Sequence, residues 1–251
     1  MRGALDRRRP RAGAGRARHS DRASETQRRM AYKLSSLALQ YPDDELLALR
    51  QELLDSAAAL GRSPAALRLG SFTGWWSQEP RLALRQHYVE TFDMSKRCSL
   101  YLTYYTAGER RDRGLALVRL RKLYRAAGLP MASGELPDYL PVMLEFAAAA
   151  PAHYGEVPLR EHRAALELLR AALGERSTPY AHVLDALCAT LGEPSALQRA
   201  KAALLAEQGP PLELVGLEPG GMPPTAMPRA MMPATGMPAP VMSPKAGAAR
   251  A

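Results

Sequence analysis

Cysteine is scarce in this chain. Only Cys98 and Cys188 occur among 251 residues, and neither lies in a CxxC pair or at metal-ligand spacing from a histidine. Both are expected to be small hydrophobic side chains on helices. Because no disulfide framework is implied, we expect a reducing, cytoplasmic setting.

Catalytic and metal-binding motifs are also missing. None of the five histidines forms HxxxH or HExxH, and no GxGxxG, P-loop or GxSxG pattern occurs. The sequence therefore predicts no enzyme, no metal site and no bound cofactor. A small enzyme on a helical bundle stays open as an alternative, because convergent titratable groups show only in a structure.

Long hydrophobic runs are absent too. No stretch of 18 apolar residues occurs, so no membrane insertion is expected. The Arg-rich beginning is followed by a segment, Ser20 to Arg29, that is polar throughout and unlike the apolar core of an export signal.

Positive charge lies mostly at the two ends. The net charge is +9, of which residues 1–23 hold +6 and residues 218–251 hold +2, leaving about +1 for the body. A folded nucleic-acid binder carries a basic surface on its body. No nucleic-acid partner is therefore expected, although a helical protein that binds nucleic acid through its basic termini remains the alternative interpretation.

Composition divides the chain into three parts. Residues 1–23 are rich in Arg, Ala and Gly, and residues 218–251 repeat Met-Pro, so neither part can bury enough apolar surface to offset its ordering entropy. We expect a disordered extension at 1–23, a helical domain at 24–217 and a disordered tail at 218–251. Copper binding by the Met-rich tail is disfavoured, because proline separates the methionines and no His or Cys lies nearby.

The body predicts an all-α fold, a single helical-bundle domain of roughly eight or nine helices. Apolar residues recur at helical spacing between Pro and Gly breaks. Residues 100–105 have a strand-like composition but no credible partner strand, so they too are predicted to be helical. The expected helices begin or end at the following positions: a capping box at Ser24–Gln27, Pro42 to Gly61, Ser63-Pro64 to Gly70, Pro80 to Thr91, Ala107 to Ala127, Asp138 to Ala150, Leu159 to Leu173, Thr178-Pro179 to Leu191, and Pro194 to Gln208.

The helix expected at 138–150 is the most apolar in the chain. Its charges are only Asp138 and Glu145, so other helices should nearly encircle it. Tyr139, Met143 and Phe146 fall on one stripe of this helix.

Several motifs together resemble one chaperone family, over about Met30 to Leu217. They are Tyr41-Pro42-Asp43-Asp44, the segment Phe92 to Arg97, Ser99 to Thr103, Gly108, Arg113-Gly114, Glu135 to Pro141, and Pro210 to Leu217. This pattern resembles the NarJ family, the assembly chaperones or delta subunits of respiratory molybdenum nitrate reductases. Glu135, Pro137 and Asp138 also match the Glu-x-Pro-Asp-His signature of related redox-enzyme maturation chaperones, although Tyr139 replaces the histidine.

The resemblance implies an all-α protein that is not a subunit of the final enzyme. It implies binding of the N-terminal leader of the nitrate reductase catalytic subunit until the molybdenum cofactor is inserted and the client is anchored to the membrane. An amphipathic leader helix would lie in a groove between helices of the chaperone.

From the residues we expect the walls and the rim of this groove. The Tyr139/Met143 helix and the segment with Tyr101, Tyr104 and Tyr105 would form the walls, and Glu135 and Asp138 would sit at the rim. Pro137, between them, is also expected to be a peptide-binding residue. Rim carboxylates can pair with basic residues of a leader. Asp138 could equally be a helix N-cap after Pro137.

Overall fold

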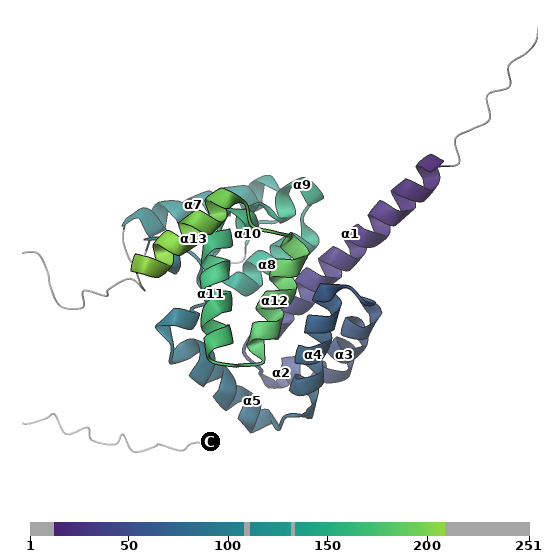
Figure 1. The fold of residues 1–251 in the computed structure, drawn as a ribbon, viewed down its shortest axis with the longest axis horizontal. Coiled ribbons are helices and arrows are strands. Elements are labelled where there is room, and N and C mark those ends of the chain that lie inside the picture. The colour runs from purple at the N-terminus through teal and green to yellow at the C-terminus, as the bar shows by residue number, and fades with distance from the viewer. Residues whose placement is uncertain (1–12, 108–110, 132–133, 209–251) are drawn as a thin grey trace, which may run out of the picture. The chain divides into compact units, whose positions relative to one another are not determined.

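The computed structural model describes residues 13–107, 111–131 and 134–208, with side chains from residue 24 onward. These residues belong to one compact unit. They form helices joined by short connections, and no strand occurs among them, so the all-α prediction is confirmed (Figure 1). The elements are α1 (Gly13–Ala38), α2 (Asp44–Ala48), α3 (Arg50–Ala59), α4 (Pro64–Gln78), α5 (Arg81–Tyr88), the π-helix η1 (Val89–Asp93), the 3-10 helix η2 (Lys96–Cys98), α6 (Tyr104–Ala107), α7 (Arg111–Ala126), α8 (Leu140–Ala149), α9 (Ala152–Gly155), α10 (Val157–Glu161), α11 (Arg163–Glu175), α12 (Tyr180–Leu191) and α13 (Ala196–Gln208).

The first helix is longer than the sequence predicts. α1 continues through Ser24–Gln27, so these residues do not cap its start, and its first turns reach into the range predicted to be disordered. An amphipathic helix that packs on several partners at its C-terminal half can extend beyond them, because each further turn adds backbone hydrogen bonds. The predicted disorder of residues 1–12 and 218–251 lies outside the described residues.

Helix boundaries otherwise follow local capping chemistry. The Ser63 side chain accepts a hydrogen bond from the Ala66 N–H and precedes Pro64, as the sequence predicts. Pro42 does not open a helix. The Asp43 carboxylate instead accepts from the Leu46 N–H and caps α2.

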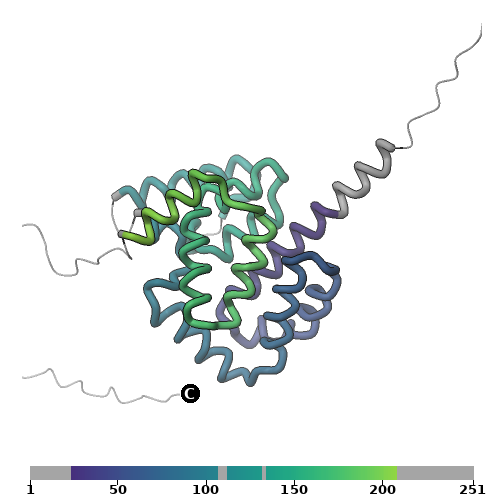
Figure 2. The backbone as a smooth tube through the Cα atoms, viewed as in Figure 1, coloured from purple at the N-terminus to yellow at the C-terminus, as the bar shows by residue number. Residues whose placement is uncertain are grey.

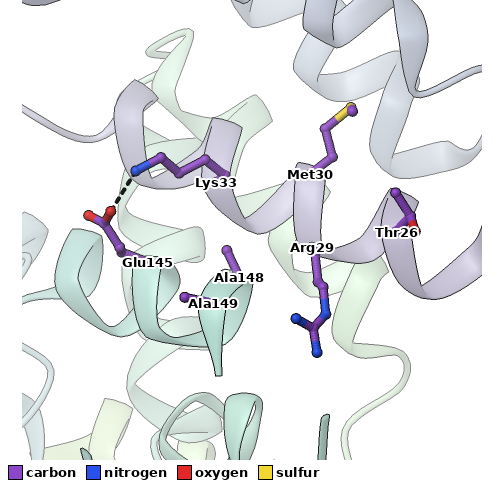
Figure 3. A pocket seen from close by; sticks show the side chains of 7 residues that line it. All are labelled: Thr26, Arg29, Met30, Lys33, Glu145, Ala148 and Ala149. Atoms are coloured by element: carbon purple, nitrogen blue, oxygen red, sulfur yellow. Dashed lines mark hydrogen bonds and ion pairs between the residues drawn. The ribbon is translucent and has the colours of Figure 1, made fainter. Parts of the chain in front are cut away.

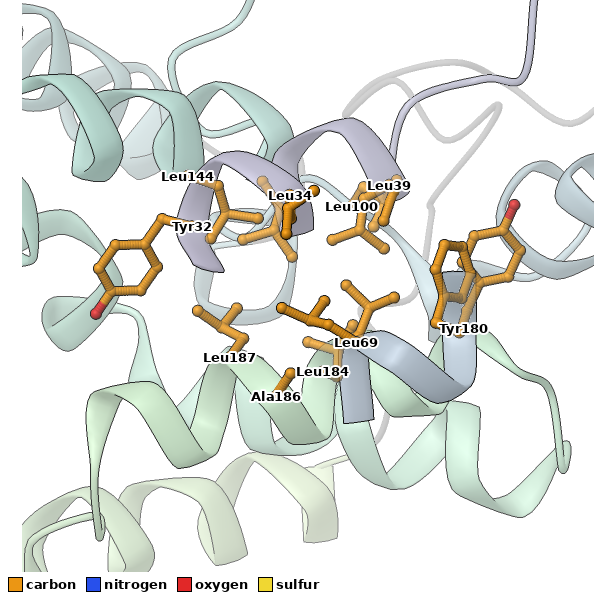
Figure 4. Packing of buried hydrophobic residues seen from close by; sticks show 14 of the residues in the cluster. Tyr32, Leu34, Leu39, Leu69, Leu100, Leu144, Tyr180, Leu184, Ala186 and Leu187 are labelled. Atoms are coloured by element: carbon orange, nitrogen blue, oxygen red, sulfur yellow. The ribbon is translucent and has the colours of Figure 1, made fainter. Parts of the chain in front are cut away.

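The core forms where α1, α4, α8 and α12 meet. α1 packs against α8 and α12, and α12 packs against α4 (Figure 1, Figure 2). Their apolar faces interdigitate, and the labelled side chains of Figure 4 show this packing: Tyr32, Leu34, Leu39, Leu69, Leu100, Leu144, Tyr180, Leu184, Ala186 and Leu187. α8 is thus covered along its inner side by α1, as its low charge predicts.

The prediction of a helix at residues 100–105 is wrong for its first part. Tyr101 forms an isolated antiparallel bridge with Tyr139, in which the Leu102 N–H donates to Asp138 O (3.0 Å) and the Leu140 N–H donates to Leu100 O (2.8 Å). Only from Tyr104 does the chain become helical. The bridge is too short to form a strand, and the strand-like composition of residues 100–105 could not identify Tyr139 as its partner.

Candidate functional site

A groove of about 580 Å³ runs along the outer face of α8. Its size lies within the range of ligand-binding pockets, about 300–1,000 Å³. We call it the α8 groove, and its lining residues are Gln40, Tyr41, Asp43, Tyr124, Leu129, Pro130, Met131, Glu135, Tyr139, Pro141, Val142, Glu145, Phe146 and Ala149.

Helical periodicity places four side chains of α8 in this groove. Val142, Glu145, Phe146 and Ala149 follow the spacing i, i+3, i+4 and i+7, which puts them on one face. The opposite wall comes from residues after α1, and the end wall comes from the connection that follows α7. The groove is therefore built by three segments that lie far apart in sequence.

The charges of the α8 groove are all of one sign. Asp43, Glu135 and Glu145 line it, whereas no Lys, Arg or His does. One oxygen of Asp43 is used to cap α2, and Glu145 pairs with Lys33 at 2.6 Å. Glu135 is exposed and forms no ion pair with any described residue. A groove with an apolar wall and one unpaired carboxylate, Glu135, at its edge favours a ligand that is both apolar and basic.

Tyrosine side chains stiffen the floor of the groove. The hydroxyls of Tyr139 and Tyr88 lie 3.3 Å apart, and Tyr88 donates to Leu39 O at 3.1 Å. Tyr124 donates to Pro137 O at 2.8 Å. Burial raises the pKa of Tyr139, and burial followed by the negative charge of Asp138 raises the pKa of Tyr124. Both hydroxyls therefore stay neutral near pH 7 and act as hydrogen-bonding groups.

A second hollow of about 460 Å³ adjoins the groove between α1 and α8. Glu145 and Ala149 line both hollows, and the Lys33–Glu145 ion pair bridges α1 and α8 beside them (Figure 3). The remaining lining residues of the second hollow are Thr26, Arg29, Met30, Lys33 and Ala148.

A larger cavity of about 670 Å³ lies beneath α13, and most of its charged side chains are paired with one another. Arg163 and Arg170 both pair with Glu167, and Arg170 also faces Asp185 at 3.5 Å. Such a paired network leaves little charge for a ligand. The α8 groove is therefore the better candidate site.

Of the predicted site residues, Glu135 and Tyr139 line the α8 groove. Tyr101 lies beside Tyr139, with ring centroids 5.2 Å apart, and is 38% exposed. Tyr105 is half-buried, and its hydroxyl donates to backbone oxygens of Arg97 and Ser99 at 3.0 Å each. The aromatic pair of Tyr101 and Tyr139 thus continues the surface at one end of the groove.

Asp138 is not a rim residue, and it does not cap α8. Its side chain is fully buried, and its Oδ2 accepts a hydrogen bond from the Thr103 hydroxyl and faces Arg113 Nη2 at 3.4 Å. α8 begins only at Leu140, with Tyr139 at the N-cap position. Asp138 therefore ties the Tyr101 segment and α7 to the start of α8, which is a structural role.

Three further predicted residues also lie inside the protein. Met143 is fully buried against the core, because it points about 100° away from Val142 and towards the face that α1 covers. Tyr104 is 8% exposed and Pro137 is buried. These residues cannot form the walls of an open groove in this structure.

Most of the side chains that form the groove are not identifiable from the sequence. Val142 and Phe146 share a face with Glu145, and this one charge within an apolar helix was the available signal for its exposed side. Tyr41 was noted only as part of a family motif. The contribution of Leu129 to Met131 had no signal, because the position of that connection depends on tertiary packing.

Metal and membrane chemistry find no support in the described part of the chain. There, no three His, Cys, Asp or Glu side chains come together as metal ligands would. Among the described helices none has the length and hydropathy to span a bilayer.

Known proteins are similar in sequence to most of the helical domain. A family model described as "Nitrate reductase delta subunit" matches residues 34–186. The "Nitrate reductase-like protein NarX" of Mycobacterium tuberculosis is 37% identical over 161 residues, which are 64% of this chain and 24% of that protein. This chain therefore spans about a quarter of that relative.

Two further relatives are of more similar length. The "Probable nitrate reductase molybdenum cofactor assembly chaperone NarJ" of Bacillus subtilis is 36% identical over 170 residues, 66% of this chain and 90% of that protein. The "Nitrate reductase molybdenum cofactor assembly chaperone NarJ" of Escherichia coli is 37% identical over 154 residues, 61% of this chain and 65% of that protein. Since the family model covers more than half of the sequence, this protein belongs to the nitrate reductase delta subunit family.

Proposed function

We propose that this protein is a chaperone of nitrate reductase assembly that binds the N-terminal leader of the catalytic subunit in the α8 groove. It would hold that subunit for insertion of the molybdenum cofactor before membrane anchoring. The names of the relatives support nitrate reductase as the client. The α8 groove, with its apolar wall and acidic edge, supports the proposed mode of binding.

The groove suits a helical segment with an apolar face and basic flanks. Val142, Phe146 and Tyr139 offer apolar surface, while Glu135 at the rim offers a carboxylate that no described cation neutralises. Apolar contacts would supply most of the affinity, and the rim charge would set the orientation and the association rate. No catalytic step is part of this function.

Both cysteines are free and buried, so the fold depends on no disulfide. This supports a reducing compartment, and we place the protein in the cytoplasm. Residues 1–12 and 218–251, which hold much of the terminal charge that motivated the nucleic-acid alternative, lie outside the described residues, and we do not propose that function.

Titration of the full chain with a fluorescent peptide tests the proposal. The peptide is the N-terminal segment of a nitrate reductase catalytic subunit, and a scrambled peptide of equal composition is the control. We expect saturable one-to-one binding that weakens with salt, and a Glu135→Lys variant should bind about 5-fold more weakly because it repels basic residues. Glu52→Lys, an exposed change on α3, should leave affinity unchanged. Equal binding of the scrambled peptide would contradict the proposal.

Lys33 should compete with the peptide for Glu145. Because Lys33 Nζ already lies 2.6 Å from Glu145 Oε1, we expect Lys33→Met to tighten peptide binding about 3-fold, the scale of an exposed ion pair. The gain should vanish in a Glu145→Gln background, as a double-mutant cycle by fluorescence anisotropy would show. If Lys33→Met tightens binding equally in both backgrounds, Glu145 is not the contact.

A further inference from the structure

The outward face of α7 carries an unusual combination of charge and apolar surface. At 100° per residue, six of its side chains fall within about 160° of the helix circumference. We call this set the basic face of α7: Leu115, Val118, Arg119, Arg121, Lys122 and Arg125. All six are exposed, whereas Leu120 and Tyr124 on the opposite side are buried.

The cations of this face are not neutralised. Several exposed basic side chains elsewhere on the surface meet carboxylates, as in Lys33–Glu145, Arg97–Glu175 and Arg81–Asp44. The four cations of the basic face of α7 form no ion pair with any described carboxylate. They therefore present a concentrated positive potential to an external partner.

Two aliphatic side chains lie in the middle of this positive surface. Leu115 is 63% exposed and Val118 is 49% exposed. Cations surround exposed aliphatic side chains in the same way on helices that bind at an anionic lipid surface.

We propose that the basic face of α7 binds the surface of an anionic membrane, with the four cations at the lipid phosphates and Leu115 and Val118 in shallow contact with the lipid. A nucleic-acid partner fits less well, because the face offers no aromatic ring for base stacking. A protein partner fits less well too, because strong protein contacts use anchors in pockets. A convex helix face with dispersed cations suits a fluid anionic surface.

Leader binding and membrane binding use opposite sides of the same helix. Tyr124 lines the α8 groove from the inner side of α7, and the basic face points the other way. Both surfaces could therefore be occupied at once. This proposal does not depend on the leader groove, and either can fail without the other.

Co-sedimentation of the full chain with lipid vesicles tests the membrane proposal. We expect binding to vesicles of 30 mol% phosphatidylglycerol in phosphatidylcholine, no binding to pure phosphatidylcholine, and loss of binding at high salt. Arg121→Gln combined with Arg125→Gln should lower the partition coefficient about 30-fold, since each basic residue near such a surface contributes about 5-fold. Leu115→Ser combined with Val118→Ser should lower it further.

A matched pair of variants distinguishes the effect of the basic face of α7 from the effect of the protein's net charge. Arg62→Gln combined with Lys201→Gln removes the same charge from exposed positions outside α7 and should change the partition coefficient less than 3-fold. An equal loss of vesicle binding in both double variants would overturn the proposal. Vesicle binding that persists in the α7 variant, but disappears when the arginines of residues 1–23 become glutamine, would also overturn it. Binding to single-stranded RNA in place of the vesicles would overturn it as well. Thermal unfolding curves would show that each variant keeps the fold.

Discussion

Replacing Val142 by arginine is expected to weaken leader binding about 100-fold without unfolding the protein. Val142 is half-buried in the wall of the α8 groove, between the turns that carry Tyr139 and Phe146. An arginine side chain at this position would occupy the groove, place a charge against its apolar wall, and repel the basic residues of the leader. Loss of a central apolar contact together with a like-charge clash amounts to about 2.7 kcal/mol, which is 100-fold in Kd.

Fluorescence anisotropy with the leader peptide measures this effect. Leu67→Arg is the matched control, because Leu67 is a 61% exposed aliphatic residue of α4 outside the groove. The control should bind the peptide as tightly as the unaltered protein. Similar Kd values for the two arginine variants would show that the leader lies elsewhere.

Truncating Arg113 is expected to destabilise the fold by about 3 kcal/mol. Asp138 is fully buried, and Arg113, whose side chain is 22% exposed, is its cationic partner at 3.4 Å. Removing one member of a buried ion pair leaves the other as an uncompensated buried charge, which costs about 3–5 kcal/mol. We take the lower value because Arg113 is partly exposed to water.

Urea unfolding of Arg113→Ala measures this loss, and a fall in Tm of about 10 °C should accompany it. Arg119→Ala is the control, since this exposed arginine of the same helix forms no described ion pair, and its effect should stay within about 0.5 kcal/mol. Asp138→Ala in the Arg113→Ala background should recover part of the lost stability, because the uncompensated buried charge is then gone. Equal stability of the two arginine variants would mean that the buried carboxylate does not need its partner.

The sequence predicts the acidic and apolar character of the candidate site, but not which face of α8 is exposed. An apolar helix preceded by acidic residues indicated a groove edged with carboxylates, and in the structure Glu135 and Tyr139 line the α8 groove. The side of α8 that carries Met143 was expected to form a groove wall, yet Met143 is fully buried, and the groove is lined by the side that carries Val142 and Glu145. In a helix with so few charges, neighbouring stripes are equally apolar, and only the partner helices decide which one is buried.

The burial of Asp138 could not be predicted from the sequence either. An acidic residue after proline and before an apolar helix predicts a cap or a rim charge. Its burial depends on Thr103 and Arg113, which arrive from 35 and 25 residues away. A buried carboxylate is stable only with such partners, and no local sequence pattern identifies them.

The sequence by itself determined the all-α class, the ends of several helices, the acidic and apolar character around Glu135, and the family. These properties follow from periodicity, capping residues and short motifs, which act over a few positions of the chain. Tertiary structure alone decided which face of α8 is open, that Asp138 is buried, and that the four cations of the basic face of α7 form no ion pair with a described carboxylate. Each of these depends on side chains brought together from distant segments, because burial and charge pairing are properties of the packed molecule.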